Sequence, residues 1–269
     1  MGFKQRERRD SQMTPSPNRL RRRRAPAALA IAFALGLGGC AGDSTGLGVN
    51  LVPQEQVQAM GVEAWNAIRQ QTPASNNSGY QQTAQRVGNA ILRGAGYDPS
   101  TWEIVVFQGD EVNAFALPGR KIGVYEGMFG VADTPDQLAA VIGHEVAHVE
   151  AHHAAERANT EVGTQLGTQI IGAALGAAGV APPETITQVL GLGAQYGVAL
   201  PYGRNQELEA DRLGLHYMAN AGYDPDAAVR VWQQMATLGG QPPEFLSTHP
   251  SPERRIAALQ QEAAQIKGR

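Results

Sequence analysis

The sequence predicts an α+β fold that is mainly helical and contains a small β-sheet. Apolar residues recur at helical spacing along most of the chain beyond residue 54. One interval, residues 102–129, is instead rich in β-branched and aromatic residues and is interrupted by turn residues. With 42% hydrophobic and 17% charged residues in a length of 269, the composition fits one globular domain with extensions.

The N-terminus has the pattern of a secretion signal. A cationic stretch at 19–24 precedes 15 apolar residues at 25–39, a run too short to span a bilayer comfortably. The run ends in Leu-Gly-Gly before Cys40, the single cysteine of the chain, and this resembles a bacterial lipobox. We therefore expect residues 1–39 to be a lipoprotein signal peptide and Cys40 to carry lipid. An uncleaved anchor is the alternative, and translation from Met13 would leave a signal of ordinary length.

Charge is distributed unevenly along the chain. Residues 1–39 hold nine basic and two acidic side chains, whereas residues 40–269 hold 13 basic and 23 acidic ones. An acidic body argues against a nucleic-acid partner.

Residues 40–53 are rich in glycine and suit a flexible tether after a lipidated cysteine. Ala41 follows that cysteine in place of aspartate, which favours lipid anchoring at the outer membrane, on its periplasmic side.

The main domain is expected over residues 54–269. It opens with two helices of apolar periodicity, 54–70 and 80–94, separated by a polar loop. The second helix ends at Ala-Gly-Tyr-Asp-Pro, and the same five residues recur at 221–225 as a second helix stop.

Three candidate strands follow the second helix. They cover residues 102–107, 111–119 and 121–129, and a Pro-Gly pair at 118–119 turns the chain between the last two. These strands are expected to form the small sheet.

A helix with several agreeing start signals comes next. Thr134 suits the N-cap, Pro135 suits the first helical position, and Gln137 completes a capping box. The helix is expected to continue to about Asn159. It contains four of the six histidines of the chain.

His144, Glu145 and His148 form an H-E-x-x-H motif on this helix. Side chains at i and i+4 lie on one helix face, so two imidazoles can bind one metal ion at about 2.0–2.1 Å each. Glu145 can act as the general base toward the attacking water. Zinc suits nitrogen ligands combined with one carboxylate. The alternative is an ordinary helix with surface charges, but the motif lies in an apolar run where unpaired ionisable groups would be costly.

A third metal ligand is expected from a different helix. A metzincin-type histidine is missing, because Ala154 occupies that position. The candidate helix 205–225 carries Glu207 and Asp211 one turn apart. We expect Glu207 to bind zinc and Asp211 to accept a hydrogen bond from a ligand imidazole. Glu209 fits an exposed acidic face instead.

Residues 162–199 are unusual because they contain a single charge, Glu184, in a sequence rich in glycine and alanine. Small residues at four-residue spacing can mark packing of membrane helices. The other interpretations are a helical hairpin that lies over a cleft, and an interface.

The combined motifs resemble the HtpX-like zinc metallopeptidases. The resemblance rests on H-E-x-x-H at 144–148, E-x-x-A-D at 207–211 and Ser-Thr-His-Pro near 247–250, and it covers about residues 80–260. The soluble periplasmic members of BepA and LoiP type are the most similar. The resemblance implies a zincin-like metallopeptidase domain with one zinc ion per chain and a sheet edge that borders the active-site helix.

The resemblance also implies further site residues. Asn113, Ala114 and Phe115 match the active-site edge strand, which would pair with the substrate backbone. His249 would approach the zinc as a fourth ligand and hold the enzyme latent, or else donate to the transition state, or else be an ordinary loop residue.

The expected function is zinc-dependent endopeptidase activity in the bacterial cell envelope. The substrates would be unfolded or misfolded envelope proteins, and the role would be quality control. The alternatives are a chaperone-like assembly factor for outer-membrane proteins with a latent zinc site, and a structural lipoprotein with a vestigial site.

Arg204 and Arg255 are candidates for orienting carboxylates or stabilising an oxyanion, with structural salt bridges as the alternative. No 34-residue repeat occurs, so a tetratricopeptide-type binding domain is not expected.

Overall fold

A computed structural model describes four parts of the chain, residues 52–160, 203–238, 244–249 and 252–268. The expected signal peptide, Cys40 with nearly all of the tether, and the segment 162–199 lie outside the described residues. Within the described parts, no helix combines the length and apolar character that crossing a membrane requires.

In the described part of the chain, the sheet has three strands, β1 (Glu103–Phe107), β2 (Ala114–Leu117) and β3 (Lys121–Tyr125). Their order is β1-β3-β2, with β1 parallel and β2 antiparallel to β3. β2 is therefore an edge strand. The expectation of a mainly helical α+β fold with a small sheet is confirmed.

The second and third strands are shorter than the sequence predicted. The predicted strand 111–119 extends in the structure only over Ala114–Leu117. The chain turns at Gly109, where φ is 142°, and the carbonyl of Val112 then accepts from the amide of Phe245 instead of pairing with a neighbouring strand. The predicted strand 121–129 ends at Tyr125, where the 3₁₀ helix η2 (Glu126–Gly130) begins.

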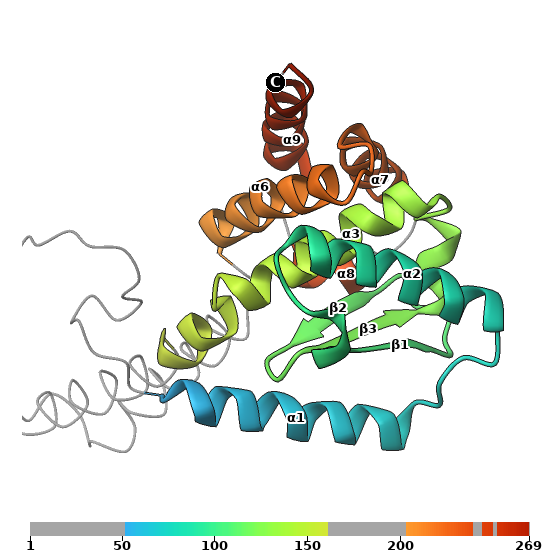
Figure 1. The fold of residues 1–269 in the computed structure, drawn as a ribbon, viewed down its shortest axis with the longest axis vertical. Helices are drawn as coiled ribbons and strands as arrows, with labels where there is room; N and C mark the ends of the chain where they lie inside the picture. The colour runs from blue at the N-terminus through green and yellow to red at the C-terminus, as the bar shows by residue number, and fades with distance from the viewer. Residues whose placement is uncertain (1–51, 161–202, 239–243, 250–251, 269) are drawn as a thin grey trace, which may run out of the picture. The chain divides into compact units, whose positions relative to one another are not determined.

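Helices cover both faces of the sheet (Figure 1). Helix α1 (Gln54–Gln71) lies along one face, and α2 (Ser78–Gly94) lies with α3 (Pro135–Glu150) on the other. Trp65 anchors α1, since its ring is buried and contacts the Phe107 ring edge-on at 5.4 Å between centroids. Helix α2 starts two residues before the predicted position because the Asn77 side chain caps it by accepting from two backbone amides.

Helix α3 (Pro135–Glu150) begins with the capping box that the sequence predicted. The predicted end near Asn159 is wrong. The helix stops at Ala151, His152 adopts a left-handed φ of 58°, and a separate helical stretch covers residues 153–160. This break changes the direction of the chain just after the H-E-x-x-H motif.

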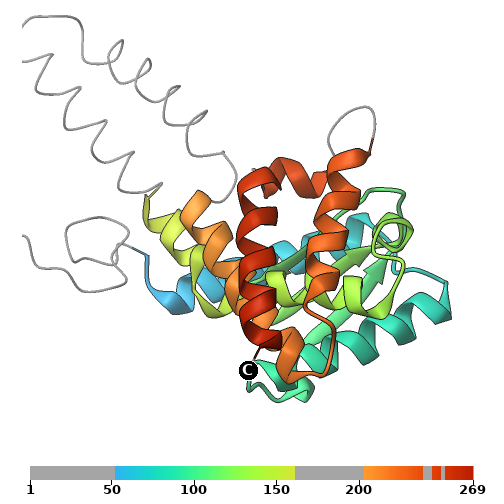
Figure 2. The same cartoon turned by 90° about the horizontal axis from the view of Figure 1, so that it is seen from above.

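The described C-terminal residues form four more helices, α6 (Arg204–Asn220), α7 (Asp226–Thr237), α8 (Glu244–Thr248) and α9 (Pro252–Lys267). Helix α9 packs against α6 and α7, as the view from above shows (Figure 2). The two Ala-Gly-Tyr-Asp-Pro motifs end α2 and α6 in the same way, with glycines at φ of 84° and 81°. The interpretation of this recurrence as shared helix-stop chemistry is confirmed.

Helices α3 and α6 cross at two glycines. A Cβ on Gly214 would lie 2.9 Å from the backbone nitrogen of His144, and one on Gly143 would lie 3.1 Å from the carbonyl oxygen of Gly214. The two backbones are therefore in direct contact at the crossing. This contact sets the acidic face of α6 against the histidine face of α3.

Candidate metal centre

The H-E-x-x-H motif lies in the buried middle of α3. His144, Glu145 and His148 are only 2%, 3% and 2% exposed. The Nε2 atoms of the two histidines lie 3.0 Å apart and converge on one point. The i, i+4 spacing therefore produces the convergent pair that metal binding requires.

Glu207 reaches the same point from α6. The residue is fully buried, and its two carboxylate oxygens lie 3.5 Å from the Nε2 atoms of His144 and His148. Its Oε2 atom is also ion-paired with Arg255 at 2.5 Å. With His249, the three residues offer four ligand atoms within 4.8 Å of one another.

A second layer of charged side chains holds these groups. The Nδ1 atom of His144 lies 3.0 Å from Asp211, so an Nδ1–H bond to this carboxylate leaves the Nε2 lone pair directed at the cluster. Arg255, 1% exposed, donates to both oxygens of Asp211 at 2.7 and 2.6 Å and lies 2.5 Å from Glu207. Its guanidinium also stacks on Trp232 at 3.7 Å. Arg204 is exposed in the first turn of α6 and makes none of the ion pairs among the described residues.

The Nδ1 atom of His148, unlike that of His144, contacts another histidine rather than a carboxylate. Its Nδ1 lies 2.8 Å from Nδ1 of His153, and Nε2 of His153 lies 3.5 Å from Glu209. For Nε2 of His148 to bind a metal, its Nδ1 must carry the proton and donate it to His153. The break at His152 turns His153 back onto His148. The sequence did not predict this contact, and its only signal was an additional histidine after the motif.

His249 directly follows α8 and belongs to the same cluster. It is 3% exposed, and its Nε2 atom is 3.4 Å from Oε1 of Glu145. Its Nδ1 atom faces the carbonyl of Phe245 at 3.1 Å. Because the amide of Phe245 bonds the carbonyl of Val112 just before β2, the α8 segment lies close to the start of the sheet edge.

The edge strand β2 borders α3. The backbone amide of Ala116 donates to Oε2 of Glu145 at 3.1 Å, so the side of β2 that faces away from β3 meets the motif. Ala114, two residues before Ala116 on the same strand, is 1% exposed. Asn113 precedes the strand and bonds β3 through its carbonyl, and the Phe115 ring packs on the opposite face near Trp65.

Burial and neighbouring charges shift the pKa values of these groups in opposite directions. Burial raises the pKa of Glu145 to about 7. Burial lowers the pKa of His148 to about 3. For His144, burial opposes protonation, but hydrogen bonds to Asp211 and Glu207 outweigh it and raise the pKa to about 9. Burial also works against the charged form of Glu207, but the histidines and Arg255 hold its pKa far below the usual value.

The donor set fits a divalent cation. Two imidazole nitrogens that point at each other across 3.0 Å need a proton or a cation between them. The carboxylate of Glu207, buried and held in its charged form by the two histidines and Arg255, supplies the negative charge that favours the cation. Two imidazoles and one carboxylate form the ligand set of many catalytic zinc sites.

The fold and this cluster define a metallopeptidase domain of the zincin type. The model of peptidase family M48 matches residues 79–263, and the chain belongs to this family. The family resemblance that the sequence motifs suggested is thereby confirmed, and membership implies a metal cofactor.

Two sets of relatives share this similarity. The chain is 35% identical over 187 residues to the mitochondrial metalloendopeptidase OMA1 of Schizosaccharomyces pombe, which covers 68% of this chain and 53% of that protein. It is 29% identical over 232 residues to the beta-barrel assembly-enhancing protease of Yersinia pestis, which covers 84% of this chain and 47% of the relative. The match thus spans about half the length of each relative.

Proposed function

We propose that this chain is a zinc-dependent endopeptidase of the bacterial cell envelope that hydrolyses unfolded or misfolded envelope proteins. The observation that carries the proposal is the convergence of His144, His148 and Glu207 on one point, with the buried carboxylate of Glu145 beside it. We assign one zinc ion per chain to these three ligands. When bound, zinc polarises the scissile carbonyl and makes the attacking water more acidic.

Glu145 is the general base in this proposal. Its pKa of about 7, raised by burial, lets it accept a proton at neutral pH and return it to the leaving amine. β2 is an edge strand, and its side away from β3 lies next to Glu145, to which the Ala116 amide donates. In this proposal an extended substrate pairs with backbone groups on that side as an added strand. Pairing through the backbone requires an unfolded segment, which is why misfolded proteins are the proposed substrates.

The envelope location rests on two observations outside the metal centre. The N-terminal sequence has the signal and lipobox pattern ending at Cys40, and relatives carry the name beta-barrel assembly-enhancing protease. We therefore place the protein in the periplasm, held by lipid on Cys40 at the outer membrane, with envelope proteins as its partners and no nucleic acid. Accumulation of the lipidated chain in the cytoplasmic fraction would contradict this placement.

The direct test compares the purified chain with its Glu145→Gln variant. We expect one zinc per chain in both proteins by elemental analysis, and cleavage of unfolded casein only by the unmodified chain. Glu63→Gln, which makes the same change on the exposed face of α1, is the matched control and should cleave normally. Full activity of Glu145→Gln, or absence of metal in both proteins, would disprove the proposal.

The position of His249 favours a second candidate function, a chaperone-like assembly factor with a latent zinc site. His249 completes a four-residue ligand cluster, and a fourth protein ligand would occupy the position that the reacting water needs. Under this alternative the unmodified chain binds zinc without cleaving casein, and His249→Ala gains cleavage. Cleavage by the unmodified chain at a rate equal to that of His249→Ala would exclude latency through this residue.

A further inference from the structure

A pocket of about 370 Å³ opens next to the metal centre, between the start of α1, the end of α3 and the turn that joins β2 to β3. His148 and Val149 form its wall on the α3 side, and Pro118 and Gly119 form it on the side of the turn. One metal ligand thus lies on the wall of the pocket. The proposed mechanism does not use this space.

Backbone strain is concentrated at this pocket. In the described part of the chain, Arg120 and His152 are the residues other than glycine that adopt positive φ, at 64° and 58°. Both line the pocket, although they come from different elements. Such conformations cost free energy and recur where a protein binds a ligand. Their coincidence at one pocket is a reason to regard it as a binding site.

The chemistry of the lining favours an anionic ligand with an apolar stem. Among the described residues, no aspartate or glutamate lines the pocket, whereas Arg120 contributes a permanent positive charge. The rings of Tyr97 and Trp102, with centroids 5.4 Å apart, supply an aromatic wall. Several acids adjoin lining residues in the sequence but bond elsewhere. Asp98 accepts from the amide of Ser100, Glu103 pairs with Lys121, and Glu150 accepts a hydrogen bond from the hydroxyl of Tyr217.

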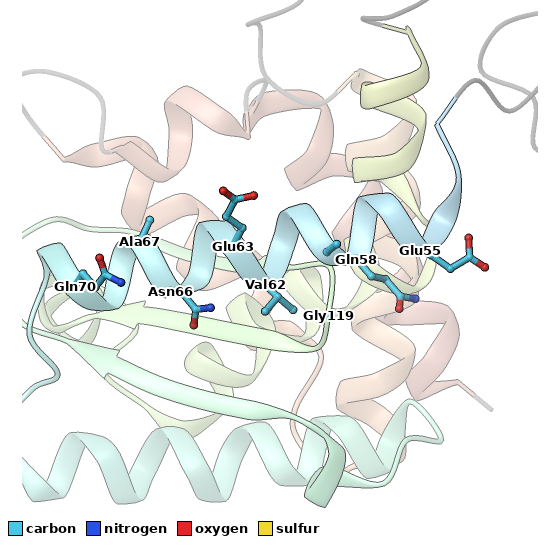
Figure 3. Close-up of a pocket in the computed structure, with 9 residues that line it drawn as sticks. Glu55, Gln58, Val62, Glu63, Asn66, Ala67, Gln70 and Gly119 are labelled. Carbon is cyan, nitrogen blue, oxygen red and sulfur yellow. The ribbon is translucent and has the colours of Figure 1, made fainter.

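A wider hollow of about 740 Å³ on the outer side of α1 has the opposite character (Figure 3). Among the described residues, its lining includes Glu55 and Glu63 and no lysine or arginine, and the two carboxylates point away from the helix. This hollow would repel an anion. The positive character therefore belongs to the pocket at His148 and is not a general property of this side of the domain.

The pocket lies within reach of a substrate strand paired to β2. Glu145 meets β2 at Ala116, and Pro118, two residues further along the same chain, already lines the pocket. Two residues of extended chain span roughly 7 Å. A side chain within about two residues of the scissile bond therefore reaches this space.

We propose that this pocket is a specificity subsite that binds a carboxylate of the substrate, with Arg120 as the specificity-determining residue. The inference rests on the proposed peptidase function, because that function brings a substrate strand to β2. An internal aspartate or glutamate side chain or a free C-terminus can supply the carboxylate. The aromatic wall suits the methylene stem of an internal glutamate.

The test measures binding of fluorescent peptides to the Glu145→Gln chain by fluorescence anisotropy. The peptides are neutral, extended and amidated at the C-terminus, and one position is varied among Glu, Gln and Lys. We expect Glu at one fixed position to bind about tenfold more tightly than Lys, the size of one charge-assisted hydrogen bond. Adding Arg120→Glu should reverse this order. Arg86→Glu, an exposed arginine of α2 that does not line the pocket, is the matched control and should leave the order unchanged.

The outcomes separate the subsite from the catalytic proposal. Equal binding of the three peptides, or no binding of any, overturns the subsite even if the unmodified chain cleaves casein. A tenfold preference for Glu supports the subsite even if casein is not cleaved, and in that case the peptidase function fails alone. A neutral peptide with a free C-terminus shows the source of the carboxylate, since tighter binding of this peptide alone would assign the pocket to chain ends.

Discussion

At the residue scale, each buried charge of the metal centre has a partner that fixes its orientation. Asp211 fixes the His144 imidazole, and Arg255 fixes Asp211 through two hydrogen bonds while it also faces Glu207. Such layers normally hold ligand imidazoles in one tautomer, and their loss weakens metal binding. His148 depends for the same purpose on His153.

This arrangement predicts that His153→Leu lowers zinc affinity about 10- to 100-fold, the usual effect of losing a partner of a ligand imidazole. His153→Asn keeps an acceptor near the Nδ1 position and should restore most of the affinity. The measurement is zinc competition with a chromophoric chelator.

His152→Asn is the matched control, because His152 contacts Gln54 rather than a ligand and asparagine tolerates its positive φ. Zinc affinity of His153→Leu equal to that of the unmodified chain would contradict a supporting role for His153.

At the element scale, the crossing of α3 and α6 brings the ligands together. The two helices and the convergence of the candidate ligand side chains on each helix face were predictable from the sequence, because i, i+4 spacing and the capping signals depend on local residues. The break after Ala151 was not, since Ala-His-His-Ala-Ala contains no glycine or proline, and the buried contact between His153 and His148 accompanies the break. Nor could the sequence show that Arg255 is buried while its neighbour Arg254 is exposed.

The crossing leads to a prediction for Gly214→Ala. The added Cβ would lie 2.9 Å from the backbone of His144, so the helices must separate, at a cost of about 1–3 kcal/mol in the free energy of unfolding. Zinc affinity should fall as well, because Glu207 moves away from the histidines. Urea unfolding and the chelator assay measure the two effects.

Gly130→Ala serves as the control, since a Cβ there meets nothing within 4 Å. A Gly214→Ala protein with unchanged stability and unchanged zinc affinity would show that the backbone contact does not position the ligands.

At the scale of the whole molecule, the metal centre joins parts of the chain that are far apart in sequence. The proposed third ligand, Glu207, follows His148 by 59 residues, and His249 follows by a further 42. A metal ion that binds the folded chain but not the unfolded chain should therefore stabilise the folded state by mass action. The free energy of unfolding rises by about 2.7 kcal/mol when the free metal concentration is 100 times Kd.

We accordingly expect zinc to raise the Tm of the metal-free chain by roughly 5–10 °C, at about 2–4 °C per kcal/mol for a domain of this size. The effect should depend on zinc concentration and disappear in Glu207→Gln. Differential scanning calorimetry after chelation and after zinc addition provides the measurement. A Tm independent of zinc would argue against a site that binds the metal tightly.

The placement of the ligands also bears on biosynthesis. Ribosomes make the two histidines of α3 before Glu207, so a nascent or prematurely ended chain carries H-E-x-x-H without its carboxylate ligand. The partial site has only two imidazoles, both on one helix, and cannot hold a metal as the complete cluster does. Metal capture, and with it hydrolytic competence, therefore waits until the C-terminal helices have been synthesised and have folded onto α3.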